Sequence, residues 1–166
     1  MRRVVTGHRN GKAVVLDDSE LEPAVTPIVR TVHLGVTGPG PVIPREGPDV
    51  PKETAYRAPV PGGTRFHVGT LPPDDVVIAR AKEKGMDVVQ WWEEHFHDTF
   101  GMHATDTIDY DIILAGEVWL ELDDGVEVHL TAGDVVVQNG TRHAWRNRGT
   151  EDCVMATVMV GAARQS

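Results

Sequence analysis

The sequence has a single cysteine, few aromatic side chains and no long apolar run. Of its 166 residues, one is a cysteine and 5% are Phe, Trp or Tyr. One cysteine forms no intrachain disulfide, and the apolar run around Cys153 predicts a buried, inert thiol. No apolar stretch reaches the roughly 20 residues that cross a bilayer. The two adjacent N-terminal arginines precede no apolar region, so we expect no secretory signal, no membrane partner and a cytoplasmic location.

Basic residues are also scarce. The chain has 16 Lys and Arg against 25 Asp and Glu, which gives a formal net charge of −9. An acidic surface repels phosphate backbones, so we expect no nucleic-acid partner. Apolar residues make up 40% of the chain. This length and balance suit one globular domain with a hydrophobic core, and we expect residues 1–166 to form it.

Residues 1–75 are expected to contain N-terminal strands and an arm. An Asn-Gly turn favours a hairpin over residues 3–17. Strands rich in β-branched residues are expected at 28–36 and 64–71. The connection over 37–63 is rich in proline and glycine, which excludes a helix or a central strand apart from a short helical turn. A connection of this length is a lid, a packed arm or a disordered segment.

The character of the chain changes twice after this arm. Residues 76–98 are expected to form a helical insertion of two short helices, the second capped by Asp87. Residues 101–160 are expected to form a barrel core, because turns containing glycine separate short strands there. The expected strands cover residues 103–114, 117–122, 126–130, 135–138, 143–147 and 153–160.

The strand expected over residues 103–114 has one polar and one apolar face, because side chains alternate along a strand. The polar face carries His103, Thr105, Thr107, Asp109 and Asp111. The apolar face carries Ile108, Tyr110, Ile112 and Leu114. Either the polar face meets water and the apolar face is the core, or the polar face lines a cavity and the apolar face packs on another layer or a partner. The pattern alone favours the first alternative.

A first motif lies in this strand. His103 and Asp109 are followed by Gly116 with the spacing His-x-His, three or four residues, Glu, six residues, Gly that is general in cupins. Thr105 stands at the second histidine position, and Asp109 stands at the glutamate position. The spacing matches throughout.

A second motif follows a hairpin. In cupins it reads Gly, five residues, Pro-x-Gly, two residues, His, three residues, Asn. Here Gly133, Gly140, His143 and Asn147 match it, with Gln138 in place of proline and one residue fewer after Gly133. Residues 101–160 therefore resemble the cupin superfamily, and the run VVVQNGTRHAWRN resembles small single-domain cupins of unassigned chemistry.

This resemblance implies a mainly all-β fold, the cupin double-stranded β-helix or jelly-roll barrel. It also implies that His103, Thr105, Asp109 and His143 point into the barrel, where the corresponding positions of cupins bind a divalent metal. The polar face then becomes the lining of a cavity. Cupins of this size are usually dimers, so a homodimer that covers the apolar face is expected.

Three functions are compatible with these residues. The first is a metal-dependent enzyme of oxygenase or lyase/isomerase type, acting on a small aromatic or carbonyl-bearing compound. Its predicted metal ligands are His103, Asp109 and His143, a set that suits Fe, Mn, Ni, Co or Zn, with Thr105 bonded to a metal-bound water. The second is a metal-independent dehydratase or cyclase that uses the same residues as acid and base. The third is a non-catalytic small-molecule binder.

Three further side chains are predicted to line the substrate pocket. Trp145 shares the parity of His143 on its strand. Trp92 lies on the second helix of the insertion, which is placed to fold over the barrel mouth. His97, or alternatively His95, is a candidate for the ligand that Thr105 cannot provide.

Overall fold

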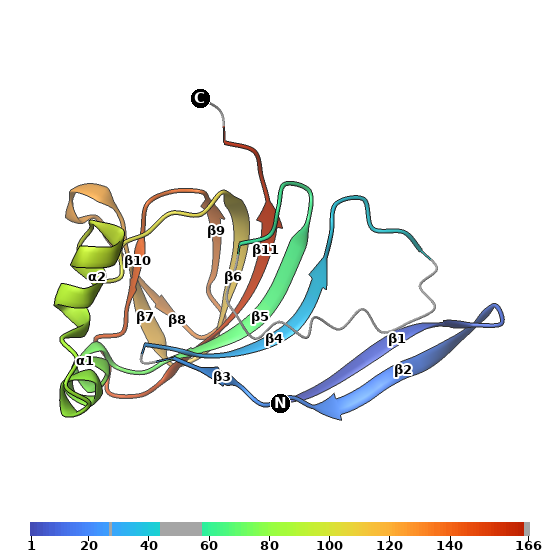
Figure 1. Ribbon diagram of the computed structural model, residues 1–166, viewed down its shortest axis with the longest axis horizontal. Coiled ribbons are helices and arrows are strands. Elements are labelled where there is room, and N and C mark those ends of the chain that lie inside the picture. Colours follow the sequence, from blue (N-terminus) through green and yellow to red (C-terminus); the bar gives the residue numbers. More distant parts are fainter. Residues whose placement is uncertain (27, 44–57, 165–166) are drawn as a thin grey trace.

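The computed structural model describes residues 1–26, 28–43 and 58–164 and is mostly β-structure (Figure 1). The N-terminal strands are β1 (Arg2–Arg9), β2 (Lys12–Glu20), β3 (Ala24–Val25), β4 (Arg30–Thr37) and β5 (Thr64–Leu71). Two helices follow, α1 (Asp74–Glu83) and α2 (Val88–Phe96). The remaining elements are β6 (Thr107–Ala115), β7 (Glu117–Glu121), the 3-10 turn η1 (Asp123–Gly125), β8 (Glu127–Thr131), β9 (Val135–Asn139), β10 (Ala144–Arg146) and β11 (Cys153–Gly161). The short helical turn expected near residue 53 lies outside the described residues.

Two antiparallel sheets build the barrel, which confirms the predicted fold class. The larger sheet has the order β3-β4-β5-β11-β6-β9, and the smaller has the order β10-β7-β8. Between them lies an apolar core of Ile113, Val118, Leu120, Leu130, Cys153 and Met155. Cys153 is buried within it, as the sequence predicts. The core occupies the end of the barrel near the C-terminus of β6 and the N-terminus of β11.

The strand expected over residues 103–114 begins later, at Thr107. Its neighbours explain the difference. The pairing of β6 with β9 ends at Ile108, and its pairing with β11 ends at Thr107. The chain before Thr107 therefore has no ladder to join, and His103 forms only an isolated bridge with His143.

The alternation along β6 is the reverse of that of an ordinary surface strand. Asp111 is 3% exposed, whereas its neighbour Ile112 is 41% exposed. Thr107, Asp109 and Ile113 are buried with Asp111, and the apolar side chains between them are exposed. The polar face thus points into the barrel, as the second alternative has it, and the partner that would cover the exposed apolar face remains a prediction.

The helices and the first hairpin lie at opposite ends of the molecule (Figure 1). Asp87 caps α2 as predicted, because its carboxylate accepts hydrogen bonds from the backbone N–H groups of Val89 and Gln90. The β1–β2 hairpin forms a sheet of its own and projects from the barrel. Among the described residues, no helix is long and apolar enough to cross a membrane.

Two adjacent isoleucines test the direction of this alternation. Ile113→Ala should lower the free energy of unfolding by about 2–5 kcal/mol, because it opens a cavity in the core. Ile112→Ala is the matched control and should cost about 0.5 kcal/mol or less, as at a surface position. Urea unfolding of both variants measures the difference. Equal losses would contradict an exposed outer face and would point to the predicted homodimer, which light scattering then tests.

Candidate functional site

Two histidines from distant parts of the chain are held side by side. The N–H of His103 donates to the carbonyl of His143, and the N–H of His143 donates to the carbonyl of His103, both at 2.9 Å. This reciprocal pair puts both side chains on the same side of the backbone. Their ring centroids lie 4.5 Å apart. His143 is 4% exposed, and His103 is partly buried.

Both imidazole rings are oriented by a hydrogen bond to the backbone carbonyl two residues earlier. Nδ1 of His103 lies 2.8 Å from the carbonyl oxygen of Gly101, and Nδ1 of His143 lies 2.9 Å from that of Thr141. A carbonyl oxygen only accepts, so each Nδ1 carries the proton and donates it. The neutral rings therefore keep the lone pair on Nε2. Two imidazole lone pairs are thus available in one place.

Two arginines fasten the segments that carry this pair. Arg142 forms ion pairs with Asp98 and Asp123. Arg146 pairs with Glu121 and also donates to the backbone carbonyl of Phe100. These contacts tie the loop that precedes His103 to the strands around His143. Both arginines are therefore engaged within the protein.

The end of the second motif serves the fold. Asn147 is 2% exposed, and its amide nitrogen donates to the carbonyls of Leu71 and Glu151. Its amide oxygen accepts from the N–H of Gly149.

In the first motif Gly116 has a φ of +74°, and a Cβ there would lie 2.6 Å from the carbonyl oxygen of Asp152. Any other residue would therefore clash with this carbonyl.

Aromatic rings flank the histidine pair. The ring of Trp145 meets that of His143 edge-on at 5.8 Å between centroids. The ring of Trp92 meets that of His103 edge-on at 6.2 Å, and its Nε1 donates to the carbonyl of Met102. The structure thus brings both predicted tryptophans to the pair.

His97 is exposed at the end of α2, in a left-handed conformation with φ of 53°, and the side chain of His95 lies outside what the structure describes.

A chain of hydroxyl groups leads from Thr105 to Asp109. The hydroxyl oxygens of Thr105 and Thr107 lie 2.7 Å apart. Thr107 in turn hydrogen-bonds the carboxyl of Asp109. Thr105, at the second histidine position of the motif, is thus bonded to Thr107. Within the described chain, Oδ1 of Asp109 and Nε2 of its cross-strand neighbour Gln138 are buried without a hydrogen-bond partner.

Further polar residues continue the site along the inner face of the sheet. The hydroxyl of Thr157 donates to the carboxylate of Asp111 at 2.7 Å. On the other side of β11, His67 is paired in register with Thr157 and with His33. Arg65 is 4% exposed on the same strand as His67. The alternation of side chains along β6 already predicted Asp111 on the polar face. The order of strands in the sheet was needed to place Thr157 next to it and His67 next to Thr157.

Burial controls the charges of this cluster. It lowers the pKa of His143 and of His67 to about 4, with a smaller contribution from the neighbouring histidine in each case. It raises the pKa of Asp111 to about 6 and also raises the pKa of Asp109. His143 and His67 are therefore neutral at pH 7. The charge of His103 lowers the pKa of Asp109, so these two groups interact electrostatically.

The three predicted metal ligands are not joined in one coordination site. Among the described residues, no group of three His, Cys, Asp or Glu side chains is placed to hold a metal ion. The histidine pair supplies two nitrogen donors, and Asp109 on β6 supplies a buried carboxylate oxygen. The metal ligand set therefore remains a prediction.

The family of the β-core follows from its sequence. Residues 94–160 match the family model described as Cupin domain. This segment is a cupin domain. The resemblance drawn from the two motifs is confirmed. The site just described lies on the inner faces of the cupin barrel, with Arg65 and His67 contributed by β5 from outside the matched segment.

Curated relatives align with a short part of the chain. The Phomopsin biosynthesis cluster protein C' of Diaporthe leptostromiformis is 55% identical over 47 residues, which are 28% of this chain and 25% of that protein. The Oryzines biosynthesis cluster protein J of Aspergillus oryzae is 44% identical over 45 residues, which are 27% of this chain and 25% of that protein. The chain thus spans about a quarter of the length of these relatives.

Two solved structures resemble most of the chain at low sequence identity. The structure of a predicted oxalate decarboxylase from Thermotoga maritima covers 89% of this chain and 98% of its own, with a TM-score of 0.48 and 21% identity. A Cupin 2 conserved barrel domain protein from Salinispora arenicola covers 81% of this chain and 76% of its own, with a TM-score of 0.45 and 18% identity.

The buried carboxyl of Asp111 should make the stability of the cupin barrel depend on pH. Its pKa rises from 3.8 in the unfolded chain to about 6 in the folded protein, so the folded state binds the proton more tightly. The resulting stabilisation is complete below pH 3.8 and is lost as the pH rises through 6. Asp111→Asn keeps the acceptor for Thr157 and removes this titration.

The stability gain of Asp111→Asn over the wild type should therefore grow between pH 4 and 6 and then level off. Urea unfolding at a series of pH values measures it. Asp124→Asn, at an exposed turn position, is the matched control and should show no such rise. A stability difference for Asp111→Asn that does not change with pH would contradict the burial of an ionisable group there.

Proposed function

We propose that the chain is a small-molecule enzyme that transfers a proton within its substrate, as in a dehydration, isomerisation or cyclisation of a carbonyl compound. The observation that carries this proposal is the histidine pair. Two fixed imidazoles present their Nε2 lone pairs together, and the buried carboxyl group of Asp109 interacts electrostatically with His103. A positioned imidazole and a carboxyl group are suited to general acid–base catalysis.

The two histidines would have different roles. We assign the role of proton acceptor to His103, because its charge and that of the Asp109 carboxylate attract each other. The proton taken up by Nε2 of His103 then returns to the substrate at a second atom, or leaves with a hydroxyl group as water. His143 stays neutral, since burial holds its pKa at about 4, and its Nε2 accepts a hydrogen bond that orients the substrate.

The flanking aromatic rings support a small organic substrate. Trp92 and Trp145 lie at the edges of the two imidazoles, so apolar surface adjoins the reacting groups on both sides. Sites for small molecules combine mostly apolar walls with a few fixed polar groups. The names of the relatives place those proteins in biosynthesis clusters. A biosynthetic intermediate is accordingly the class of substrate that we propose.

The first test is exchange of hydrogen for deuterium. A panel of 1,3-dicarbonyl and β-hydroxycarbonyl compounds is incubated with the protein in deuterated water and analysed by mass spectrometry. The wild type should label at least one compound at carbon. His103→Gln should lower the exchange rate by about 10²–10⁴-fold, the usual contribution of a general base. His129→Gln, at an exposed histidine of β8, is the matched control and should exchange like the wild type.

Metal content separates this proposal from the metal-dependent alternative. Elemental mass spectrometry is applied to wild type, His103→Ala and His143→Ala, all purified without chelator or affinity-column metal. Activity should survive exhaustive chelation if the residues act as acid and base alone. Stoichiometric Fe, Mn, Ni, Co or Zn in the wild type, lost in both variants together with the activity, would overturn the proposal in favour of the predicted metal enzyme.

A further inference from the structure

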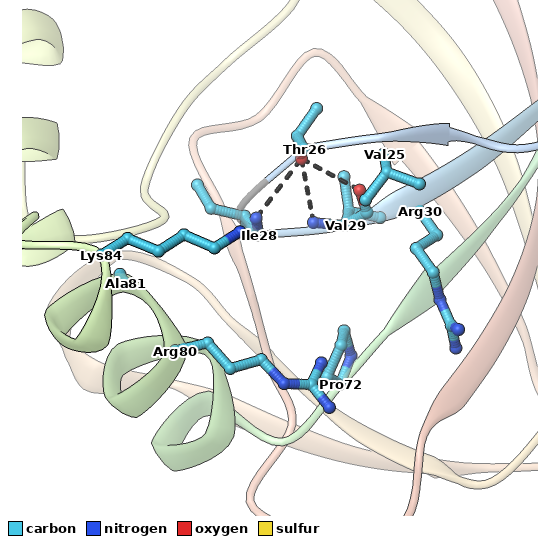
Figure 2. A pocket seen from close by; sticks show the side chains of 9 residues that line it. All are labelled: Val25, Thr26, Ile28, Val29, Arg30, Pro72, Arg80, Ala81 and Lys84. Atoms are coloured by element: carbon cyan, nitrogen blue, oxygen red, sulfur yellow. Dashed lines mark hydrogen bonds between the residues drawn. The ribbon is translucent and has the colours of Figure 1, made fainter.

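A small cavity lies outside the barrel interior, between the turn that joins β3 to β4, the end of β5 and α1 (Figure 2). Its volume is about 160 Å³. The walls are apolar, from Val25, Ile28, Val29, Pro72 and Ala81. None of the residues of the proposed reaction lines it.

Three basic side chains surround this apolar cavity. Arg80 and Lys84 extend from α1 toward Pro72 and Ile28, and Arg30 lies on the opposite side (Figure 2). Arg30 forms an ion pair with Asp152 at 2.5 Å. The structure gives Arg80 and Lys84 no ion pair with any residue that it describes. This cavity thus gathers more positive than negative charge, in a chain of net charge −9.

Arg80 lies in the last turn of α1, and Lys84 is the residue that ends the helix, four positions further along. Like charges at this spacing repel each other. The C-terminus of a helix favours nearby cations, which explains the presence of Arg80, Lys82 and Lys84 at the end of α1. The helix dipole does not explain why an apolar cavity lies beside Arg80 and Lys84. An anion bound in the cavity would neutralise the repulsion between them.

Hydrogen bonds of Thr26 with Ile28 and Val29 lie in the opposite wall. The hydroxyl of Thr26 accepts hydrogen bonds from the N–H groups of Ile28 and Val29, and it lies 2.9 Å from the carbonyl of Val29, to which it donates. The N–H of Thr26 also donates to that carbonyl. Ala81, at the base, is 2% exposed. The hydrogen bonds of Thr26 fix its position relative to Val29 on this side of the cavity.

The geometry points to a second ligand site here, for a small carboxylate whose apolar part enters the cavity while its carboxylate faces Arg80, Lys84 and Arg30. Arginine holds a carboxylate through two parallel N–H donors, and Arg80 has its guanidinium uncommitted among the described residues. The apolar walls favour a carboxylate with a hydrocarbon portion over a fully hydrated anion such as inorganic phosphate. The acidic remainder of the surface disfavours unspecific anion binding elsewhere.

Benzoate and its neutral isostere benzamide are the probes. Their affinities for the full chain are measured by NMR titration at low salt, with inorganic phosphate as a third ligand. Benzoate should bind at least tenfold more tightly than benzamide and more tightly than phosphate. Arg80→Gln combined with Lys84→Gln should abolish the preference for benzoate. Lys82→Gln, an exposed cation on the same helix outside the cavity, is the matched control and should leave the preference unchanged.

Each result bears on the proposal. A preference for benzoate that survives in the double variant, or falls equally in Lys82→Gln, would overturn the site. Tighter binding of phosphate than of benzoate would overturn the assignment to carboxylates. A wild-type preference retained in His143→Gln and lost in the double variant would establish a site separate from the histidine pair. Thermal unfolding of the variants checks that the glutamine substitutions leave the fold intact.

Discussion

The reciprocal backbone hydrogen bonds between His103 and His143 are the constraint on which the rest of the site depends. They join a loop before β6 to a loop after β9, beyond the point where the sheet ladder has ended. Without them the two rings would belong to separate, independently moving segments. With them, and with each Nδ1 committed to a carbonyl two residues earlier, ring position and proton position are both determined by the backbone. The ion pairs of Arg142 and Arg146 support the same junction from outside.

Sequence reasoning located much of this arrangement because both motifs are local patterns. The spacing from His103 through Asp109 to Gly116 and the position of His143 follow from short-range order, and so does the parity that places Trp145 beside His143. The inward direction of the polar face required the family resemblance, since the strand pattern alone favoured the opposite. The helical cap at Asp87 and the Asn-Gly hairpin were predictable from local chemistry.

Other features depend on contacts between distant strands and leave no local signal. The placement of His67 beside Thr157, and of Arg65 beside Met159, follows from the pairing of β5 with β11, which nothing in the sequence of either strand specifies. The start of β6 at Thr107 depends on where two neighbouring strands end. The hydroxyl contact between Thr105 and Thr107 depends on a threonine at the second histidine position of the motif. The ion pair between Arg142 and Asp98 could not be predicted from the sequence either, because the two residues lie far apart along the chain.

The inner face of β6 is apolar at one end and polar at the other, and this difference bears on how such barrels diversify. Ile113 belongs to the apolar core, whereas Asp111, Asp109 and Thr107 succeed one another toward the other end, away from that core. Cores tolerate changes poorly when volume changes, but the polar positions lie outside the packed cluster. Exchange of these three side chains can alter reactivity without repacking the residues that keep the sheets together. One end of β6 thus contributes to the stability of the fold, and the other end carries the polar side chains whose exchange would change the chemistry of the site.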